Sequence, residues 1–107
     1  MKNYRRRIMD TLLEKKLQAK GAVLIEGPKW CGKTTTAEEI ATSKIMLAKP
    51  DIKEHFKSLL EIDTDAALAG ETPMLIDEWQ TVPKLWDAVR YTVDHRHAMG
   101  QFILTGS

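Results

Sequence analysis

The fold is decided between residues 22 and 35, where the chain reads AVLIEGPKWCGKTT. Residues 22–26 form an apolar run of strand length, as is typical of a strand buried on both faces of a parallel sheet. Residues 27–34 match GxxxxGKT, the pattern in which a glycine-rich turn joins a strand to the start of a helix. We therefore expect a strand, a tight loop and a helix in direct succession.

This loop has the composition of a phosphate-binding site. Gly27 and Gly32 let the backbone approach an anion closely, so that successive N–H groups and the helix N-terminus point toward it. We expect Lys33 to reach the β- and γ-phosphates of a nucleoside triphosphate, the Thr34 hydroxyl to coordinate Mg²⁺, and Thr35 to hydrogen-bond the α-phosphate. The candidate nucleotide-binding residues are Gly27, Pro28, Lys29, Trp30, Cys31, Gly32, Lys33, Thr34 and Thr35.

Two adjacent acids, Asp77 and Glu78, end the apolar run that begins at Met74. The carboxyl ends of parallel strands form the edge at which α/β proteins bind their ligands. We expect Asp77 to hold Mg²⁺ from the side opposite Thr34, and Glu78 to act as the general base that polarises an attacking water. Thr105 ends the next strand at the same edge, where its hydroxyl either orients that water or only favours the strand conformation.

The rest of the chain alternates between helical and strand patterns. Helices are expected at residues 7–20, 33–42, 51–62 and 65–68, and from Pro83 to Gly100. Short apolar runs predict strands at residues 45–47, 74–78 and 102–105, the first of them closed off by Pro50. Strands that alternate with helices at this rhythm predict an α/β fold with three αβα layers around a mainly parallel sheet.

Length and composition limit the class of protein. With 107 residues the chain forms at most one domain, and 43% hydrophobic and 29% charged residues are typical of an ordinary folded protein. The net charge of +1 creates no field that would attract nucleic acid or anionic lipid. Cys31 is the only cysteine, which fits a reducing compartment, and no apolar run is long enough to span a membrane. We therefore expect a cytoplasmic protein with no membrane partner, in which this segment gives no sign of nucleic-acid binding.

Two further groups of side chains have simpler structural explanations. The aromatic residues of the second half are expected to pack in the core or between helices rather than to stack on a base: Trp79, Trp86, Tyr91 and Phe102. His95 and His97 have no metal-ligand spacing to the cysteine, so we expect them at a solvated helix end.

With these motifs placed, the chain resembles the AAA-superfamily ATP-binding proteins of bacteria and archaea, whose members join an N-terminal ATPase domain to a C-terminal domain of unknown function. The resemblance rests on residues 24–35, 75–80, 85–90 and 102–107. It implies that Lys33 and Thr34 belong to the Walker A motif, that Asp77 and Glu78 form the Walker B motif, and that Thr105 is the polar sensor. It also implies a P-loop NTPase fold with strand order 5-1-4-3-2.

The same resemblance implies that residues 1–107 are the N-terminal part of a P-loop ATPase domain. The fifth strand, an arginine finger, the lid and the C-terminal domain would follow Ser107, and the strand at residues 22–26 would be left as an apolar edge. Nucleotide binding should then outlast hydrolysis in this segment, because an arginine finger contributes ~10³-fold or more to turnover.

Three functions fit these motifs. The first is binding of Mg-ATP and its hydrolysis to ADP and phosphate, coupled to an unknown partner or domain. The alternatives are a nucleotide-dependent binding switch with negligible turnover and a small P-loop kinase. The pair Asp77 and Glu78 favours water as the acceptor, whereas the choice between ATP and GTP, and a homo-oligomeric state, remain open at this stage.

Overall fold

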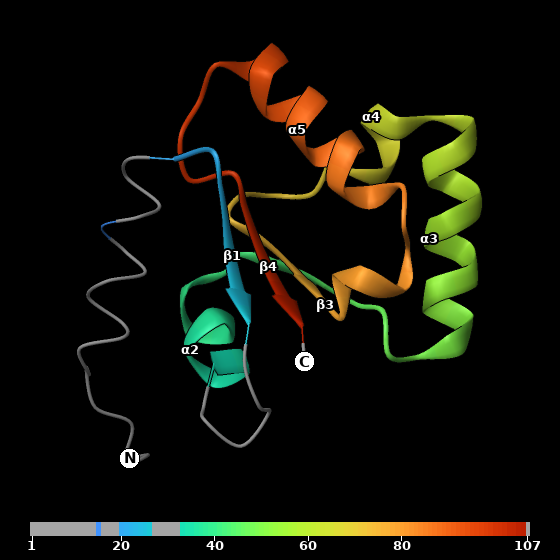
Figure 1. Cartoon of the computed structure of the whole chain (residues 1–107), viewed down its shortest axis with the longest axis horizontal. Coiled ribbons are helices and arrows are strands. Elements are labelled where there is room, and N and C mark those ends of the chain that lie inside the picture. Colours follow the sequence, from blue (N-terminus) through green and yellow to red (C-terminus); the bar gives the residue numbers. More distant parts are fainter. Residues whose placement is uncertain (1–14, 16–19, 27–32, 107) are drawn as a thin grey trace.

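The computed structural model describes residue 15, residues 20–26 and residues 33–106, without the side chains of residues 26 and 33–36 (Figure 1). Most of the helix expected at residues 7–20, and the loop at residues 27–32, lie outside the described residues. The elements follow in the order β1 (Ala22–Glu26), α2 (Lys33–Ile40), β2 (Ser43–Met46), α3 (Pro50–Ile62), α4 (Thr64–Ala67), β3 (Met74–Asp77), the 3₁₀ helix η2 (Trp79–Thr81), α5 (Leu85–Arg96) and β4 (Phe102–Gly106).

The strands form one sheet in the order β1-β4-β3-β2. Every pairing in it is parallel. Consecutive strands must therefore be joined by a crossover that returns the chain from the carboxyl ends of the strands to their amino ends. The helices α2, α3 and α5 lie in these crossovers. The α/β class and the parallel sheet expected from the sequence are confirmed, and the order agrees with the 1-4-3-2 part of the order that the resemblance implies.

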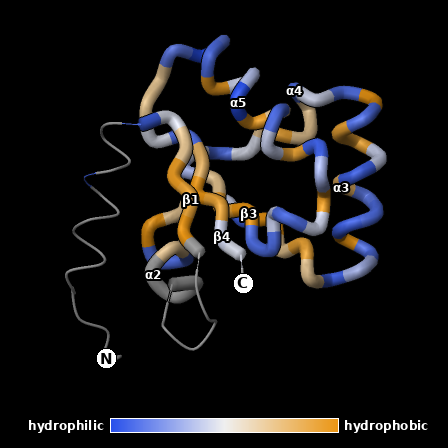
Figure 2. Tube along the Cα trace, viewed as in Figure 1, coloured by the Kyte–Doolittle hydropathy of each residue, from blue (hydrophilic) through white to orange (hydrophobic). Residues whose placement is uncertain are grey.

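Alternation along the strands divides the core between the two faces of the sheet. On one face, residues of β3 and β4 pack with side chains of α3, α4 and α5; this larger cluster includes Phe56, Leu60, Leu68, Met74, Ile76, Leu85, Val89, Phe102 and Leu104. On the other face, Val23, Leu75 and Ile103 pack against Ala37 of α2. Figure 2 shows the hydrophobic segments gathered in β1, β3 and β4, with helices around them, as the three-layer expectation requires.

The second strand and the third helix differ from the sequence-based boundaries. β2 covers Ser43–Met46 rather than residues 45–47, and Leu47 follows it as a buried core residue. Pro50 was expected only to close the strand, but it stands in the first turn of α3. The fixed φ of proline suits that position, where its missing N–H has no intrahelical partner to lose.

The last helix is shorter than expected at both ends. It begins at Leu85 rather than Pro83, because η2 and the residues after it occupy the preceding segment. It ends at Arg96 rather than near Gly100, because His97 adopts a left-handed conformation with φ 53° and donates its N–H to the carbonyl of Val93. Such a residue terminates a helix by satisfying one of its last free carbonyl groups.

Three of the four aromatic residues pack as expected, but Tyr91 lies exposed on α5 rather than in the core or between helices. Phe102 is fully buried, and the rings of Trp79 and Trp86 lie 5.5 Å apart at 41°. Tyr91 is 56% exposed and packs on His95, within the same helix, with ring centroids 3.9 Å apart. None of the helices in the described part of the chain has the length and apolar character that a membrane crossing requires.

Candidate functional site

Two polar side chains meet inside the sheet at the carboxyl ends of β3 and β4. Asp77 and Thr105 are direct neighbours in the parallel register, and the Thr105 hydroxyl donates a hydrogen bond of 2.6 Å to Oδ1 of Asp77. Thr105 is fully buried and Asp77 is 7% exposed. A short hydrogen bond to a carboxylate in so dry a setting is of the strong, charge-assisted kind, so it fixes the orientation of the Asp77 side chain.

This pair lies on the face of the sheet that α2 covers. Leu75 and Ile103 precede Asp77 and Thr105 by two residues, and both pack in the cluster that contains Ala37 of α2. Because side chains two residues apart in a strand point to the same face, Asp77 and Thr105 share that face. The helix that begins at Lys33 therefore packs on the same face of the sheet as the Asp77 side chain.

Glu78 leaves the strand direction immediately after Asp77. Its backbone is left-handed, with φ 60° and ψ 43°, which is uncommon for a residue with a side chain and costs on the order of 1–3 kcal/mol. The surroundings hold this conformation: its N–H donates to the Thr105 carbonyl at 2.7 Å, and its carbonyl accepts from the Thr81 hydroxyl at 2.9 Å. Glu78 is 8% exposed, so two adjacent acids are buried at this edge of the sheet.

A glutamine that sequence reasoning did not assign to the site contacts Glu78. The Gln80 Nε2 group donates a hydrogen bond of 2.6 Å to Oε1 of Glu78. The stretch Asp77-Glu78-Trp79-Gln80 is present in the sequence, but a residue two positions beyond an acid in a strand pattern has no defined direction. The left-handed turn at Glu78 and the 3₁₀ helix after it bring the two side chains together.

Most of the loop residues proposed from the sequence lie outside the part of the chain that the structure describes. Gly27, Pro28, Lys29, Trp30, Cys31 and Gly32 are not among the described residues, and Lys33, Thr34 and Thr35 are described only as the first turn of α2. The structure does show that β1 ends at Glu26 and that α2 begins at Lys33. The loop thus connects the carboxyl end of a strand to the amino end of a helix, which is the setting that phosphate binding requires.

The donor chemistry at this edge suits Mg²⁺. Magnesium is a hard cation that takes oxygen ligands and is usually held by one or two carboxylates together with phosphate oxygens. Asp77 supplies a buried carboxylate whose orientation is fixed by Thr105. The residues present therefore fit the ion that the sequence motifs imply.

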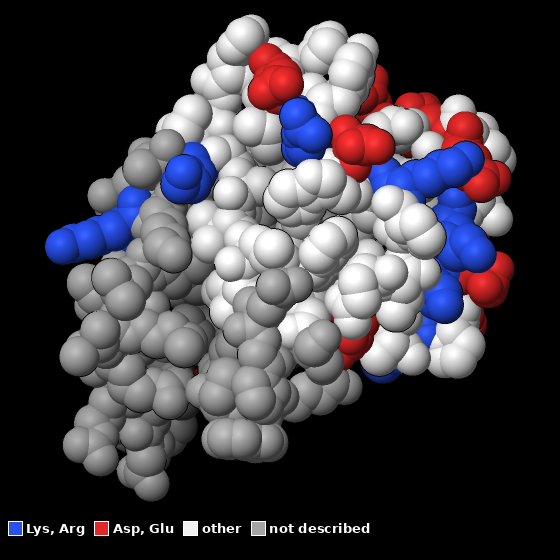
Figure 3. Space-filling model, in the orientation of Figure 1, with Lys and Arg blue, Asp and Glu red and all other residues white. Residues whose placement is uncertain are grey.

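Other polar groups in the described part of the chain form neither a metal site nor, on the face that Figure 3 shows, a surface of a single charge sign. His95 and His97 are exposed at the end of α5, as expected for a solvated helix end, and no group of three or more His, Cys, Asp or Glu side chains within the described ranges could hold a metal. In Figure 3, basic and acidic side chains are interspersed over the described part of this face. Such a mixture does not create a single-sign field there.

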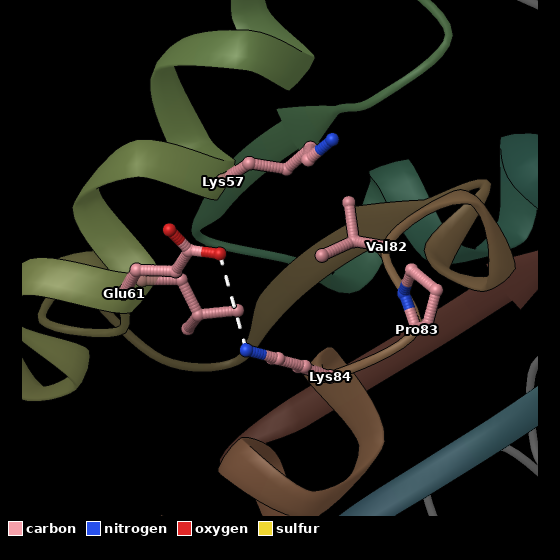
Figure 4. A pocket seen from close by; sticks show the side chains of 6 residues that line it. Lys57, Glu61, Val82, Pro83 and Lys84 are labelled. Carbon is pink, nitrogen blue, oxygen red and sulfur yellow. Dashed lines mark ion pairs between the residues drawn. The ribbon is translucent and has the colours of Figure 1, made fainter.

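A small hollow of about 140 Å³ lies between α3 and the segment that precedes α5 (Figure 4). Its lining residues are Lys57, Leu60, Glu61, Val82, Pro83 and Lys84. Glu61 and Lys84 form an ion pair of 3.9 Å with both side chains well exposed, which contributes little to stability. None of the buried polar residues at the sheet edge lines this hollow.

Comparison with known proteins identifies one family. The family model described as an AAA domain matches residues 19–107 of this chain. The match includes the loop at residues 27–34, the adjacent acids Asp77 and Glu78, and Thr105. No curated protein and no solved structure gave a significant match.

Proposed function

This chain belongs to the AAA domain family, whose members are P-loop ATPases, and on that premise we propose that it binds Mg-ATP and hydrolyses it to ADP and phosphate. Family membership indicates nucleotide binding and ATPase-type activity in general, and the residue roles that follow are our proposal. One observation carries it. The buried carboxylate of Asp77 is held by Thr105 at the carboxyl edge of the sheet, on the face that α2 covers.

The proposed nucleotide site is the loop from Gly27 to Thr34. Its position between β1 and α2 supports a role in which backbone N–H groups and the helix N-terminus hold the phosphates. We assign Lys33 to the β- and γ-phosphates and Thr35 to the α-phosphate. A fixed cation beside the γ-phosphate favours the charge distribution of the transition state over that of the ground state.

Asp77 and Thr34 are the proposed protein ligands of Mg²⁺. Held by these two side chains, a bound Mg²⁺ would supply positive charge that offsets the negative charge developing on the phosphate oxygens. Thr105 contributes by keeping the Asp77 carboxylate in one orientation, so that the acid does not have to reorganise when the ion binds. Since the Thr105 hydroxyl already donates its proton to Asp77, it remains able only to accept from a neighbouring water.

Glu78 is the proposed general base. Water attacks the γ-phosphorus, the bond from that phosphorus to the bridging oxygen breaks, ADP leaves, and the carboxylate of Glu78 takes the proton of the water. The left-handed turn at Glu78 supports this assignment, because it takes Glu78 out of the strand alternation that would otherwise place its side chain on the face opposite to Asp77. The free energy of hydrolysis would act on a further domain or a partner protein.

Phosphate release from Mg-ATP tests the proposal. Glu78→Gln should bind nucleotide with unchanged Kd and lower kcat by ~10²-fold or more, since general-base catalysis is worth about 10²–10⁴-fold. Glu54→Gln is the matched control, because Glu54 is an exposed acid of α3, and it should leave both quantities unchanged. Tight binding without phosphate release would identify a switch, and transfer of the γ-phosphate to a small acceptor would identify a kinase.

A further inference from the structure

The Gln80 amide makes contacts on two sides at the edge of the sheet. On one side its Nε2 group donates to Oε1 of Glu78 at 2.6 Å. On the other side its Oε1 atom occupies the space that a Cβ atom on Gly106 would fill. A carboxylate can only accept hydrogen bonds, so the amide nitrogen must face Glu78 and the amide oxygen must face Gly106.

Gly106 is the last residue of β4 and directly follows Thr105. It is buried, and the side chains nearest to its missing Cβ are those of Gln80 and Trp79. A glycine at this position therefore leaves room for the Gln80 amide beside the strand end. Gln80 thus connects Gly106, at the end of β4, to the side chain of Glu78. The residue before Gly106 is Thr105, which holds Asp77.

We propose that Gln80, held against Gly106, is a positioning residue that keeps the Glu78 carboxylate oriented to take a proton from water. This inference rests on the proposed role of Glu78 as the general base. A hydrogen bond to Oε1 restricts the rotation of the carboxylate. It uses one lone pair, and an ionised carboxylate can accept further hydrogen bonds through both of its oxygens. Orientation matters here because general-base catalysis depends on hydrogen-bond reach between the base and the water.

The first test replaces the amide by an apolar group of similar length. Gln80→Met should lower kcat by ~10- to 100-fold, the loss expected from a misplaced catalytic group, while Kd for Mg-ATP stays unchanged. Gln101→Met is the matched control, since Gln101 precedes the opposite end of β4 and its amide donates to the Met99 carbonyl; it should leave kcat unchanged. An unchanged or higher kcat in Gln80→Met would overturn the inference.

A second variant displaces the amide without altering Gln80 or Glu78. In Gly106→Ala the new methyl group occupies the space of the amide oxygen, and a flexible side-chain end can move away from it. This variant should lower kcat as Gln80→Met does. The kcat of the double variant should be no lower than that of Gln80→Met alone, because the amide that alanine displaces is already absent. Additive losses of kcat would indicate that Gly106 acts independently of Gln80 and would contradict the proposal.

A spectroscopic measurement separates this inference from the proposed function. In the nucleotide-free protein, a short hydrogen bond to a carboxylate should move the side-chain amide proton resonance of Gln80 away from that of Gln101. Glu78→Gln should shift the Gln80 resonance back and leave the Gln101 resonance in place. If the Gln80 resonance has the same chemical shift in Glu78→Gln as in the parent, the inference is overturned, whatever the rate of hydrolysis. If the parent protein releases no phosphate while the resonance responds, the proposed function fails and the hydrogen bond between Gln80 and Glu78 stands.

Discussion

The Thr105 hydroxyl holds the Asp77 carboxylate through a 2.6 Å hydrogen bond between adjacent strands, with both side chains buried. Thr105 therefore orients the Asp77 carboxylate at this edge, whether or not its hydroxyl also contacts water. A buried carboxylate that loses a hydrogen-bond donor bears part of its desolvation cost without compensation. The bond should consequently contribute both to folding and to the readiness of Asp77 for a metal ion.

Thr105→Val tests both contributions. Valine has nearly the same shape as threonine but has no hydroxyl, so the variant should lose about 1–3 kcal/mol of unfolding free energy in urea titrations. The Mg²⁺ concentration that gives half-maximal hydrolysis should rise, because the Asp77 side chain is no longer held. A variant with parental stability and parental Mg²⁺ dependence would show that the hydrogen bond has no energetic importance.

Thr92→Val provides the opposite case in the same chain. Thr92 on α5 is 4% exposed, and its hydroxyl has no hydrogen-bond partner within the described part of the chain. Replacing an unpaired buried hydroxyl by a methyl group removes a desolvation cost, so the variant should be as stable as the parent or more stable by up to about 1 kcal/mol. Urea unfolding measured beside Thr105→Val checks the contrast, and equal losses in both variants would refute the hydrogen-bond explanation.

Lys33→Ala should abolish tight binding of ATP while the protein remains folded. Lys33 is the first residue of α2, and the first turn of a helix tolerates alanine well. Titration of labelled ATP measures the binding, and circular dichroism verifies the fold. Lys44→Ala, which removes an exposed lysine of β2, should bind ATP as the parent does. Parental affinity in Lys33→Ala would remove that lysine from the proposed site.

The sequence was sufficient for the strands that carry the site, because their signal is local. Apolar runs that end in polar residues placed β1, β3 and β4 almost to the residue, and parallel pairing then brought Asp77 beside Thr105. Gln80 could not be found in this way, since its contact with Glu78 depends on a left-handed residue that no local pattern requires. The end of α5 was misplaced for the same reason, because His97 takes a left-handed conformation although glycine is the usual residue there.

Arg96 ties the end of α5 to neighbouring segments. Its guanidinium donates to the Leu68 carbonyl at 2.8 Å and to the Gln101 side chain at 2.9 Å, and it lies 5.5 Å from the centre of the Phe102 ring. Arg96→Met should lower the free energy of unfolding by about 1–3 kcal/mol, because the Leu68 carbonyl loses a charged donor. kcat should stay parental, since these contacts lie at the amino end of β4 and not at its carboxyl end. A large loss of kcat with unchanged stability would instead indicate a catalytic arginine.

The start of β1 packs against α5 too closely to admit a side chain at Gly21. A Cβ atom there would collide with the Cγ1 atom of Val93, and the stiff χ1 of valine prevents that methyl group from moving away. Gly21→Ala should therefore destabilise the protein by about 1–3 kcal/mol through overpacking. Val93→Ala removes the opposing methyl groups, so the double variant should be more stable than the sum of the single losses predicts. Urea unfolding of the parent, both single variants and the double variant measures this coupling, and strict additivity would mean that the two residues do not press on each other.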